Sequence, residues 1–411
     1  KKVITPLCVK SLLVSIVVLS VISCEDSDAT SIRFEPRRDI AFTRAETEIS
    51  GGANEFSFKL LSQISKGKGN NTFSPLSAHM ALSMLCNGAA GETYTEMIEN
   101  LGYKNLELDV LNSYNQKLLK ELHSLDNTSF VSIANGFWAN NELPIRESYK
   151  SQISNYYQAN ISNIDSQNMK NHIAEINAWC DEKTKHMIPS LVEPDDDFDA
   201  LIANALCFEG TWRNGFDKNF TTTDKFYNGN GSASNVLMMN RTDTFRVSFD
   251  YGLRVIDIPF GNESFSMYVI MSEDDNENIV EVVSSLNNAN WTNIKERLRT
   301  MKINLSLPKF EIKNTINFKP ILTSMGFEKT FSDCPDFSNL CNGMKVSKVF
   351  QKNYFKIDEN GAKAASVTVS EMNDTGLGTT SPKFKVNRPF IFLIAEKSSS
   401  VILFAGIIRE M

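Results

Sequence analysis

The chain has 411 residues, a formal net charge of −7 at pH 7, and 42% hydrophobic residues. A chain of this kind can bury a large core, but its length allows either one large domain or several small ones. The net charge is negative and the sequence contains no long run of basic residues. It therefore argues against binding to the phosphate backbone of nucleic acids.

Residues 1–23 are predicted to be a signal peptide. Lysines at positions 1, 2 and 10 precede an apolar segment, residues 11–22, which is long enough for a signal-peptide core and short for a transmembrane helix. The segment ends in Ser23-Cys24, which resembles the lipobox of bacterial lipoproteins and implies that Cys24 is lipidated. The alternative is an ordinary secretory signal with an incidental cysteine. With either signal, the protein leaves the cytoplasm.

Residues 24–45 are predicted to be a lipid-anchored tether, because they show no sustained hydrophobic periodicity. The sequence Glu25-Asp26-Ser27-Asp28 resembles export signals that send some Bacteroidetes lipoproteins to the outer surface. We therefore expect an envelope lipoprotein, anchored to the outer membrane through Cys24 and exposed at the cell surface.

Residues 46–411 are predicted to be one mixed α and β domain. No Pro-rich linker divides them, and neither an internal repeat nor a βαβ pattern occurs. Helical periodicity dominates residues 49–102, where Ser74-Pro75 marks a helix start. Further helices are predicted at 106–125, 146–157 and 170–185, and strands at 129–138, 201–208, 245–260, 264–271, 303–312, 384–396 and 401–408.

The remaining cysteines do not resemble a disulfide framework. Three lie in apolar sequence and are predicted to be buried thiols, and the last two are close enough in sequence to suggest a bridge. In chain order they are Cys86, Cys180, Cys207, Cys334 and Cys341.

Motifs for metal or nucleotide chemistry are missing from the sequence. The four histidines have no zinc-binding spacing, Gly229-Asn230-Gly231 lacks the third glycine of a dinucleotide loop, and no Gly-x-Ser-x-Gly elbow occurs. We expect no metal, no cofactor and no enzyme activity. A glycan-binding surface would need clustered aromatic residues, but the four tryptophans are dispersed.

A long connection, residues 358–383, separates the predicted strand at 354–357 from the strand that begins near 384. A compact domain seldom keeps such a connection unless it has a function. Alternate positions carry small uncharged side chains and no proline occurs from 361 to 381, so the segment could become a strand with one buried face. The residues alone equally allow a flexible surface loop with accidental alternation. The small residues are Ala362, Ala364, Ser366, Thr368 and Ser370.

The segment 359–365, with Glu359, Gly361, Ala362, Ala364 and Ala365 at the matching positions, resembles the hinge of the serpins, E-x-G-small-x-A-A. Sequences across the chain are similar to further landmarks of that family, at 71–77, 176–184, 204–212, 384–392 and 402–406. The resemblance covers residues 46–411. It implies an α+β fold, with helices packed around a large central β-sheet and an exposed reactive-centre loop at 359–382.

The same resemblance implies a suicide inhibitor of serine proteases, with cysteine proteases as a further class. Serpins are cleaved in this loop, insert it into the sheet and trap the protease as an acyl-enzyme. The family's register places the scissile bond at Thr375-Gly376, whereas Met372, Asp374 and Leu377 remain alternatives. Threonine and glycine suggest elastase-like or subtilisin-like targets over trypsin-like ones.

Other matched positions are structural by role. The resemblance assigns Ser74, Ser77, Asn204 and Gln351 to the shutter beneath the opening sheet. It assigns Trp212 to the breach where the loop enters, and Lys309 as an ion-pair partner of Glu359. Their alternative is ordinary core polarity. Gln351 replaces a frequent histidine, so we expect no pH sensitivity from that site.

A non-inhibitory serpin, acting as a carrier or chaperone, is the main alternative function. Such serpins typically carry a charged or bulky residue at an inward hinge position, and Ala362 argues against this. The expected protein is a monomer whose partner is the target protease.

Overall fold

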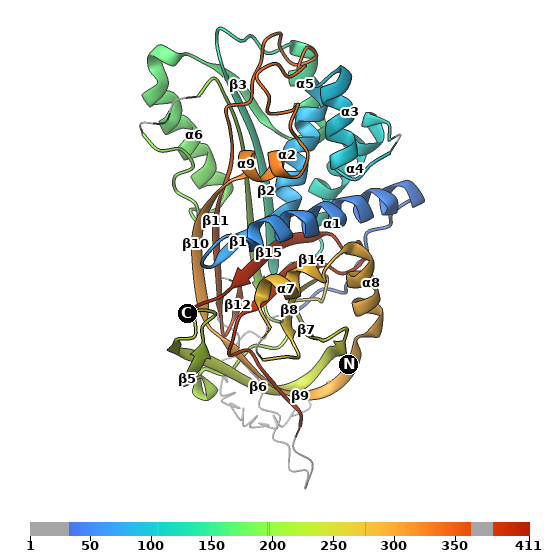
Figure 1. Cartoon of the computed structure of the whole chain (residues 1–411), viewed down its shortest axis with the longest axis vertical. Coiled ribbons are helices and arrows are strands. Elements are labelled where there is room, and N and C mark those ends of the chain that lie inside the picture. Colours follow the sequence, from blue (N-terminus) through green and yellow to red (C-terminus); the bar gives the residue numbers. More distant parts are fainter. Residues whose placement is uncertain (1–32, 105, 195, 197, 276, 363–380) are drawn as a thin grey trace, which may run out of the picture. The chain divides into compact units, whose positions relative to one another are not determined.

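The sheet next to the predicted loop has six strands in the described part of the chain, in the order β10-β11-β12-β4-β2-β3 (Figure 1). The computed structural model describes residues 33–411 except for 105, 195, 197, 276 and 363–380. The strand bounds are β2 Ser129–Asn140, β3 Asn160–Ile164, β4 Ala200–Thr211, β10 Phe310–Asn317, β11 Lys348–Asp358 and β12 Gly361–Ala362.

Strand β4 lies centrally in this sheet because its sequence is apolar along nearly its whole length. Residues 200–208 are all buried, as expected for a strand covered on both faces. On one side β4 pairs antiparallel with β2. On the other side it pairs parallel with β11 at 201–203, and antiparallel with β12 at 210–211.

The second sheet follows the order β1-β15-β14-β8-β7-β6-β9-β13, with β5 paired to β6 off this path. Its strands β14 and β15 are fully buried, in agreement with their continuous apolar sequences. The bounds are β1 Asn71–Phe73, β5 Thr222–Tyr227, β6 Ala233–Asp250, β7 Leu253–Pro259, β8 Phe265–Ser272, β9 Arg299–Pro308, β13 Lys383–Lys385, β14 Phe390–Glu396 and β15 Ile402–Ile408.

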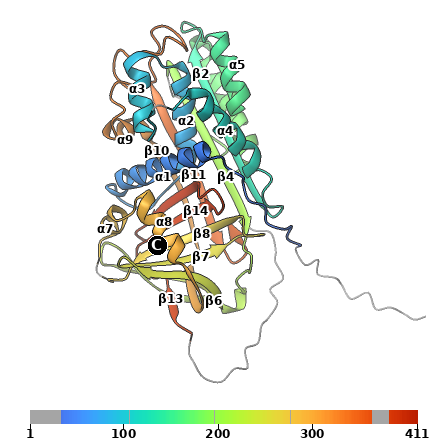
Figure 2. The ribbon, with the colours of Figure 1, turned by 90° about the vertical axis from the view of Figure 1, so that its right-hand side faces the viewer.

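The helices α2 to α5 gather at one end of the structure, and β6 with β13 at the other (Figure 2). Every residue of α2 is buried, and Ser74 with Pro75 begins this helix as the sequence predicts. No described helix is long and apolar enough to cross a membrane. The helices are α1 Arg44–Ser65, α2 Pro75–Gly88, α3 Gly91–Asn100, α4 Leu108–Leu122, α5 Glu147–Tyr157, α6 Met169–Lys183, α7 Ile279–Ser284, α8 Asn288–Arg297 and α9 Phe318–Ser324.

Two predicted strands are divided in the structure. The segment 245–260 contains the end of β6 and all of β7, because Tyr251 and Gly252 form a turn with φ of 59° and 68°. The segment 303–312 contains parts of β9 and β10, which belong to different sheets and are separated by Lys309. Alternation continues across the first break, so periodicity alone does not reveal it. At the second break the buried apolar positions change from 303, 305 and 307 to 310 and 312, and this change marks the boundary at Lys309.

All five described cysteines are free thiols. Cys86, Cys180 and Cys207 are buried as predicted, and burial raises the pKa of Cys180 to about 12. The suggested bridge between Cys334 and Cys341 does not form: Cys334 is exposed and Cys341 is buried.

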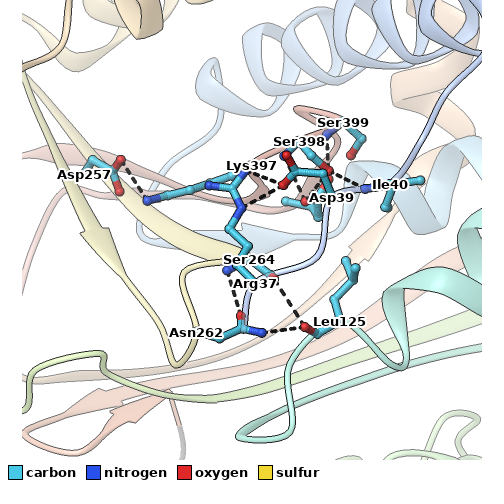
Figure 3. A network of polar contacts seen from close by, with 11 residues as sticks. Arg37, Asp39, Ile40, Leu125, Asp257, Asn262, Ser264, Lys397, Ser398 and Ser399 are labelled. Atoms are coloured by element: carbon cyan, nitrogen blue, oxygen red, sulfur yellow. Dashed lines mark hydrogen bonds and ion pairs between the residues drawn. The ribbon is translucent and has the colours of Figure 1, made fainter. Parts of the chain in front are cut away.

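Residues 33–43 have no helix or strand, yet they lie against the domain (Figure 3). Ile40 is buried and its N–H donates to Ser398 Oγ at 2.9 Å. The ring of Phe42 packs on Tyr114 with centroids 5.5 Å apart, and Phe34 lies under the guanidinium of Arg213. Individual side chains, rather than a regular apolar face, therefore hold residues 33–43 on the domain.

Replacing Ile40 with alanine should lower thermal stability, because the truncation removes buried apolar surface and leaves a cavity. We expect a loss of about 2 kcal/mol, measured by thermal unfolding of residues 33–411. The control Glu35→Ala changes an exposed side chain of the same segment. Equal stability of the two variants would show that the segment does not contribute through Ile40.

Candidate functional site

The hinge begins where β11 turns back into the sheet. β11 ends at Asp358, and β12 starts at Gly361 after two intervening residues. Gly361 pairs with Asp358 on one side and Thr211 on the other, and Ala362 pairs with Ile357 and Gly210. Ala362 is 1% exposed. The first two residues after the turn therefore already form a strand between β11 and β4.

Gly361 has to be glycine at this point of the sheet. Its φ is +143°, a conformation that residues with a side chain rarely adopt. A Cβ atom here would lie 2.0 Å from the carbonyl oxygen of Gly210. The absence of a side chain thus allows the backbone of β12 to approach β4.

Trp212 lies at the end of β4 and contacts the hinge turn through both of its N–H groups. Nε1 donates to the carbonyl of Asp358 at 3.0 Å, and the backbone N–H donates to the carbonyl of Asn360 at 2.9 Å. The fully buried indole stacks on Phe260, with centroids 4.4 Å apart and an angle of 8° between the planes. A rigid aromatic pair therefore supports the turn.

Glu359 is a buried carboxylate at the tip of the turn. Lys309 Nζ lies 2.8 Å from its Oε2, and Thr221 Oγ1 donates to its Oε1 at 2.9 Å. The Glu359 side chain is 3% exposed and that of Lys309 is 30% exposed. Burial raises the pKa of the Glu359 carboxyl, but the hydrogen bonds from Lys309 and Thr221 outweigh burial and hold this pKa below its ordinary value.

Lys309 reaches the hinge because it is the single residue between β9 and β10. Its backbone N–H donates to the carbonyl of Leu237 on β6 at 2.8 Å. The next residue, Phe310, pairs with Ile357 on β11. The ammonium therefore projects from the junction of the two sheets toward Glu359.

The shutter positions form two separate groups. Ser74 Oγ caps α2 by accepting from Ser77 N at 3.1 Å. The side-chain amide of Gln351 contacts the backbone of Ser74 twice: its Oε1 accepts from the N–H at 2.7 Å, and its Nε2 donates to the carbonyl at 3.3 Å. Gln351 thereby ties β11 to the start of α2.

Asn204 on β4 forms the second group with its cross-strand neighbour Asn135 on β2. The Nδ2 of Asn204 donates to Oδ1 of Asn135, whose own Nδ2 donates to the carbonyl of Tyr157 at 2.8 Å. The Oδ1 of Asn204 and the Oγ of Ser77 are buried without a hydrogen-bond partner among the described residues.

A family model described as "Serpin (serine protease inhibitor)" matches residues 51–411. The chain belongs to the serpin family. The α+β fold implied by the resemblance is thereby confirmed, and the thermophilic serpin tengpin in its native state matches with a TM-score of 0.82 at 27% identity, over 92% of this chain and 98% of tengpin.

Similar serpins come from distant organisms. "Intracellular coagulation inhibitor 2" of Tachypleus tridentatus is 32% identical over 381 residues, covering 90% of this chain and 92% of the relative. "Serpin B4" of Homo sapiens is 28% identical over 384 residues, covering 87% and 98%. Thyroxine-binding globulin in complex with thyroxine has a TM-score of 0.79 at 23% identity, over 88% and 99%, which supports the fold alone.

The serpin structure brings five of the predicted site residues together at the hinge: Glu359, Gly361, Ala362, Trp212 and Lys309. Ser74, Ser77, Gln351 and Asn204 lie deeper in the same sheet region, but no hydrogen bond between described residues joins Asn204 to the other three. The predicted residues Ala364, Ala365, Thr375, Gly376 and Cys24 lie outside the described residues.

Sequence reasoning missed several residues of the serpin hinge and shutter. Gly210 lies within the landmark at 204–212 but has no role assigned to it there, and no motif marks Thr221. Both residues approach the hinge only through the tertiary fold. Asn135 was detectable in principle, because an asparagine inside a predicted apolar strand needs a partner. No group of three potential metal ligands occurs in the described part of the chain.

Gly361→Ala should push β12 out of the sheet, because the new Cβ would overlap the Gly210 carbonyl. We expect faster amide hydrogen exchange in residues 354–362 and a stability loss of roughly 1–3 kcal/mol. Gly343→Ala is the matched control, since Gly343 also has a positive φ of 76° but no atoms near the added Cβ. If both variants lose the same stability, backbone strain rather than the contact with Gly210 explains the effect.

The Glu359–Lys309 pair should make the stability of the protein fall with pH in the acidic range. Because the folded-state pKa of Glu359 is lowered, the carboxylate contributes stability above about pH 4.5 that is lost as the pH falls through the folded-state pKa. The difference in melting temperature between wild type and Glu359→Gln should thus shrink between pH 6 and about pH 3. Glu311→Gln, which removes an exposed carboxylate paired with Lys313, is the control. A constant difference for Glu359→Gln would contradict this role.

Proposed function

We propose that this serpin is inhibitory: it traps a serine protease as an acyl-enzyme by inserting its cleaved loop between β11 and β4. The observation that carries this proposal is β12, whose two residues already lie between those strands.

The pairing register supports continued insertion. Where β11 and β4 pair directly, Lys348 faces Leu201, an offset of 348 − 201 = 147 residues. Across β12, Ile357 and Gly210 both face Ala362, and the offset is again 357 − 210 = 147. A longer inserted strand would therefore keep one register with both neighbours, with no bulge or slip required.

The same register predicts the contacts of the inserted strand. Continuing antiparallel from Ala362 places Ala364 between Phe355 and Phe208, and Thr368 between Gln351 and Asn204. Phe355 and Phe208 are 2% and 5% exposed, so a small side chain suits the inward position between them. Thr368 would bring a hydroxyl to the shutter, where Asn204 Oδ1 lacks a partner among the described residues.

The chemistry of the trap needs only one cleavage step. The protease serine attacks the carbonyl of Thr375, the Thr375–Gly376 amide bond breaks, the Gly376 amine leaves with a proton, and an ester joins the protease to Thr375. The thirteen residues that follow Ala362, up to Thr375, span roughly 40 Å as a strand. Insertion would thus carry the esterified protease along the sheet before water hydrolyses the ester. The small residues at the cleaved bond favour elastase-like or subtilisin-like proteases.

The test incubates residues 33–411 with pancreatic elastase, neutrophil elastase, subtilisin and trypsin, followed by denaturing gels and mass spectrometry of the released peptide. We expect an SDS-stable complex with at least one elastase-like or subtilisin-like protease, and a peptide that begins at Gly376. Ala362→Arg should be cleaved without forming a complex, because a charged side chain cannot occupy this buried position. Ala362→Ser keeps a small side chain and should form the complex.

Cleavage by every protease with no complex in the wild type would overturn the inhibitory function and favour a carrier or chaperone. Anchoring to the outer membrane through Cys24 and the monomeric state stay predictions, and mass measurement of the lipid on Cys24 tests the first.

A further inference from the structure

Arg241 is a buried arginine on β6, away from the hinge itself. Its side chain is 13% exposed and lies between two rings, with the guanidinium carbon 4.9 Å from the centroid of Phe216 and 4.7 Å from that of Phe245. Burial lowers its pKa to about 10, so the group still carries its charge at neutral pH. Burying such a charge is costly unless it makes specific contacts.

The contacts of Arg241 fix the segment that begins at Trp212, residues 212–217, here called the breach segment. One guanidinium N–H donates to the carbonyl of Gly215 at 3.4 Å, while Nε lies 3.5 Å from Oδ2 of Asp243. That same carboxylate oxygen accepts from Asn214 Nδ2 at 2.7 Å. Two residues of β6, Arg241 and Asp243, therefore hold the breach segment. They contact the Gly215 carbonyl, the Asn214 side-chain amide and the Phe216 ring.

The breach segment in turn holds the hinge turn. The backbone N–H groups of Trp212 and Phe216 donate to the carbonyls of Asn360 and Glu359, both at 2.9 Å. Phe216 also packs edge-on against Trp212, with centroids 6.2 Å apart. The Phe216 ring thus contacts Arg241 while its backbone contacts the hinge.

Arg241 is also connected, through strand pairing, to β13, the strand that follows the loop. It pairs with Leu305 on β9, and Leu305 pairs with Phe384 on β13, the first strand after the loop. One strand, β6, is therefore connected to the hinge through Arg241 and to the C-terminal end of the loop through β9.

We propose that Arg241 is a positioning residue for loop insertion, acting through the breach segment on the hinge turn. This inference rests on the proposed inhibitory function. After cleavage, insertion competes with hydrolysis of the acyl-enzyme. If the breach segment is not held in place, the hinge would enter the sheet more slowly, so more acyl-enzyme would hydrolyse. The attack of the protease on the scissile bond would be unaffected.

The experiment compares Arg241→Met and Arg241→Lys with wild type, using a protease that forms the complex. We expect the rate constant of loop cleavage to stay within about twofold, while the moles of inhibitor consumed per mole of protease rise roughly threefold or more in Arg241→Met. Arg241→Lys should lie between, because lysine keeps the charge but not the planar group between the rings.

Arg297→Met is the control, since Arg297 also covers a ring, Tyr251, and pairs with an aspartate, Asp250, at the C-terminal end of β6. It should leave the consumption ratio unchanged. A lower melting temperature in Arg241→Met with an unchanged consumption ratio would show a merely structural role and overturn the proposal.

A second measurement needs no protease and separates this inference from the proposed function. Amide hydrogen exchange of residues 208–217 should be faster by about tenfold in Arg241→Met and unchanged in Arg297→Met. If wild type forms no complex with any protease, the inhibitory function fails, and the exchange result alone decides whether Arg241 positions the breach segment. Unchanged exchange in Arg241→Met would overturn that role.

Discussion

The close approach of Gly361 to the carbonyl of Gly210 is the constraint on which the hinge depends. Without a side chain, and with a φ outside the range of other residues, Gly361 lets β12 enter between two strands that share one register. Trp212, Glu359 and the residues that hold them keep the turn at the depth where this approach occurs. If the hinge were shifted along β4, a residue with a side chain would take the place of Gly361 opposite the carbonyl of Gly210, where a Cβ atom does not fit.

The energetics of this region are those of a polar cluster in an apolar setting. The carboxylate of Glu359 and the guanidinium of Arg241 both lie at the breach segment, and their side chains are only 3% and 13% exposed. Glu359 is held by Lys309 and Thr221, and Arg241 by two aromatic rings and Asp243. Loss of the oppositely charged partner would leave a buried charge without compensation. Such an arrangement favours one closed geometry over nearby alternatives.

The sequence predicts most of the fold and the part of the site that is local in the chain. Glu359, Gly361 and Ala362 follow from one hinge motif, and the apolar strands follow from their periodicity. Gly210 and Thr221 could not be predicted, because their importance arises where distant backbones meet. The lack of periodicity in 24–45 predicts a tether, whereas in the structure single residues such as Ile40 hold residues 33–43 on the domain. The family resemblance assigns Gln351 to the shutter, but only the structure shows its two hydrogen bonds to the backbone of Ser74.

The junction at Lys309 has a consequence for how the chain can vary in length. Pro308 ends a strand of one sheet and Phe310 begins a strand of the other, so a single residue sets the alignment between the two sheets. An insertion or deletion here would shift β10 by one position and exchange its inward and outward faces against β11. The side chain at 309 can be replaced at the cost of the ion pair, but the spacing cannot. This point of the fold therefore tolerates substitution and excludes any change in length.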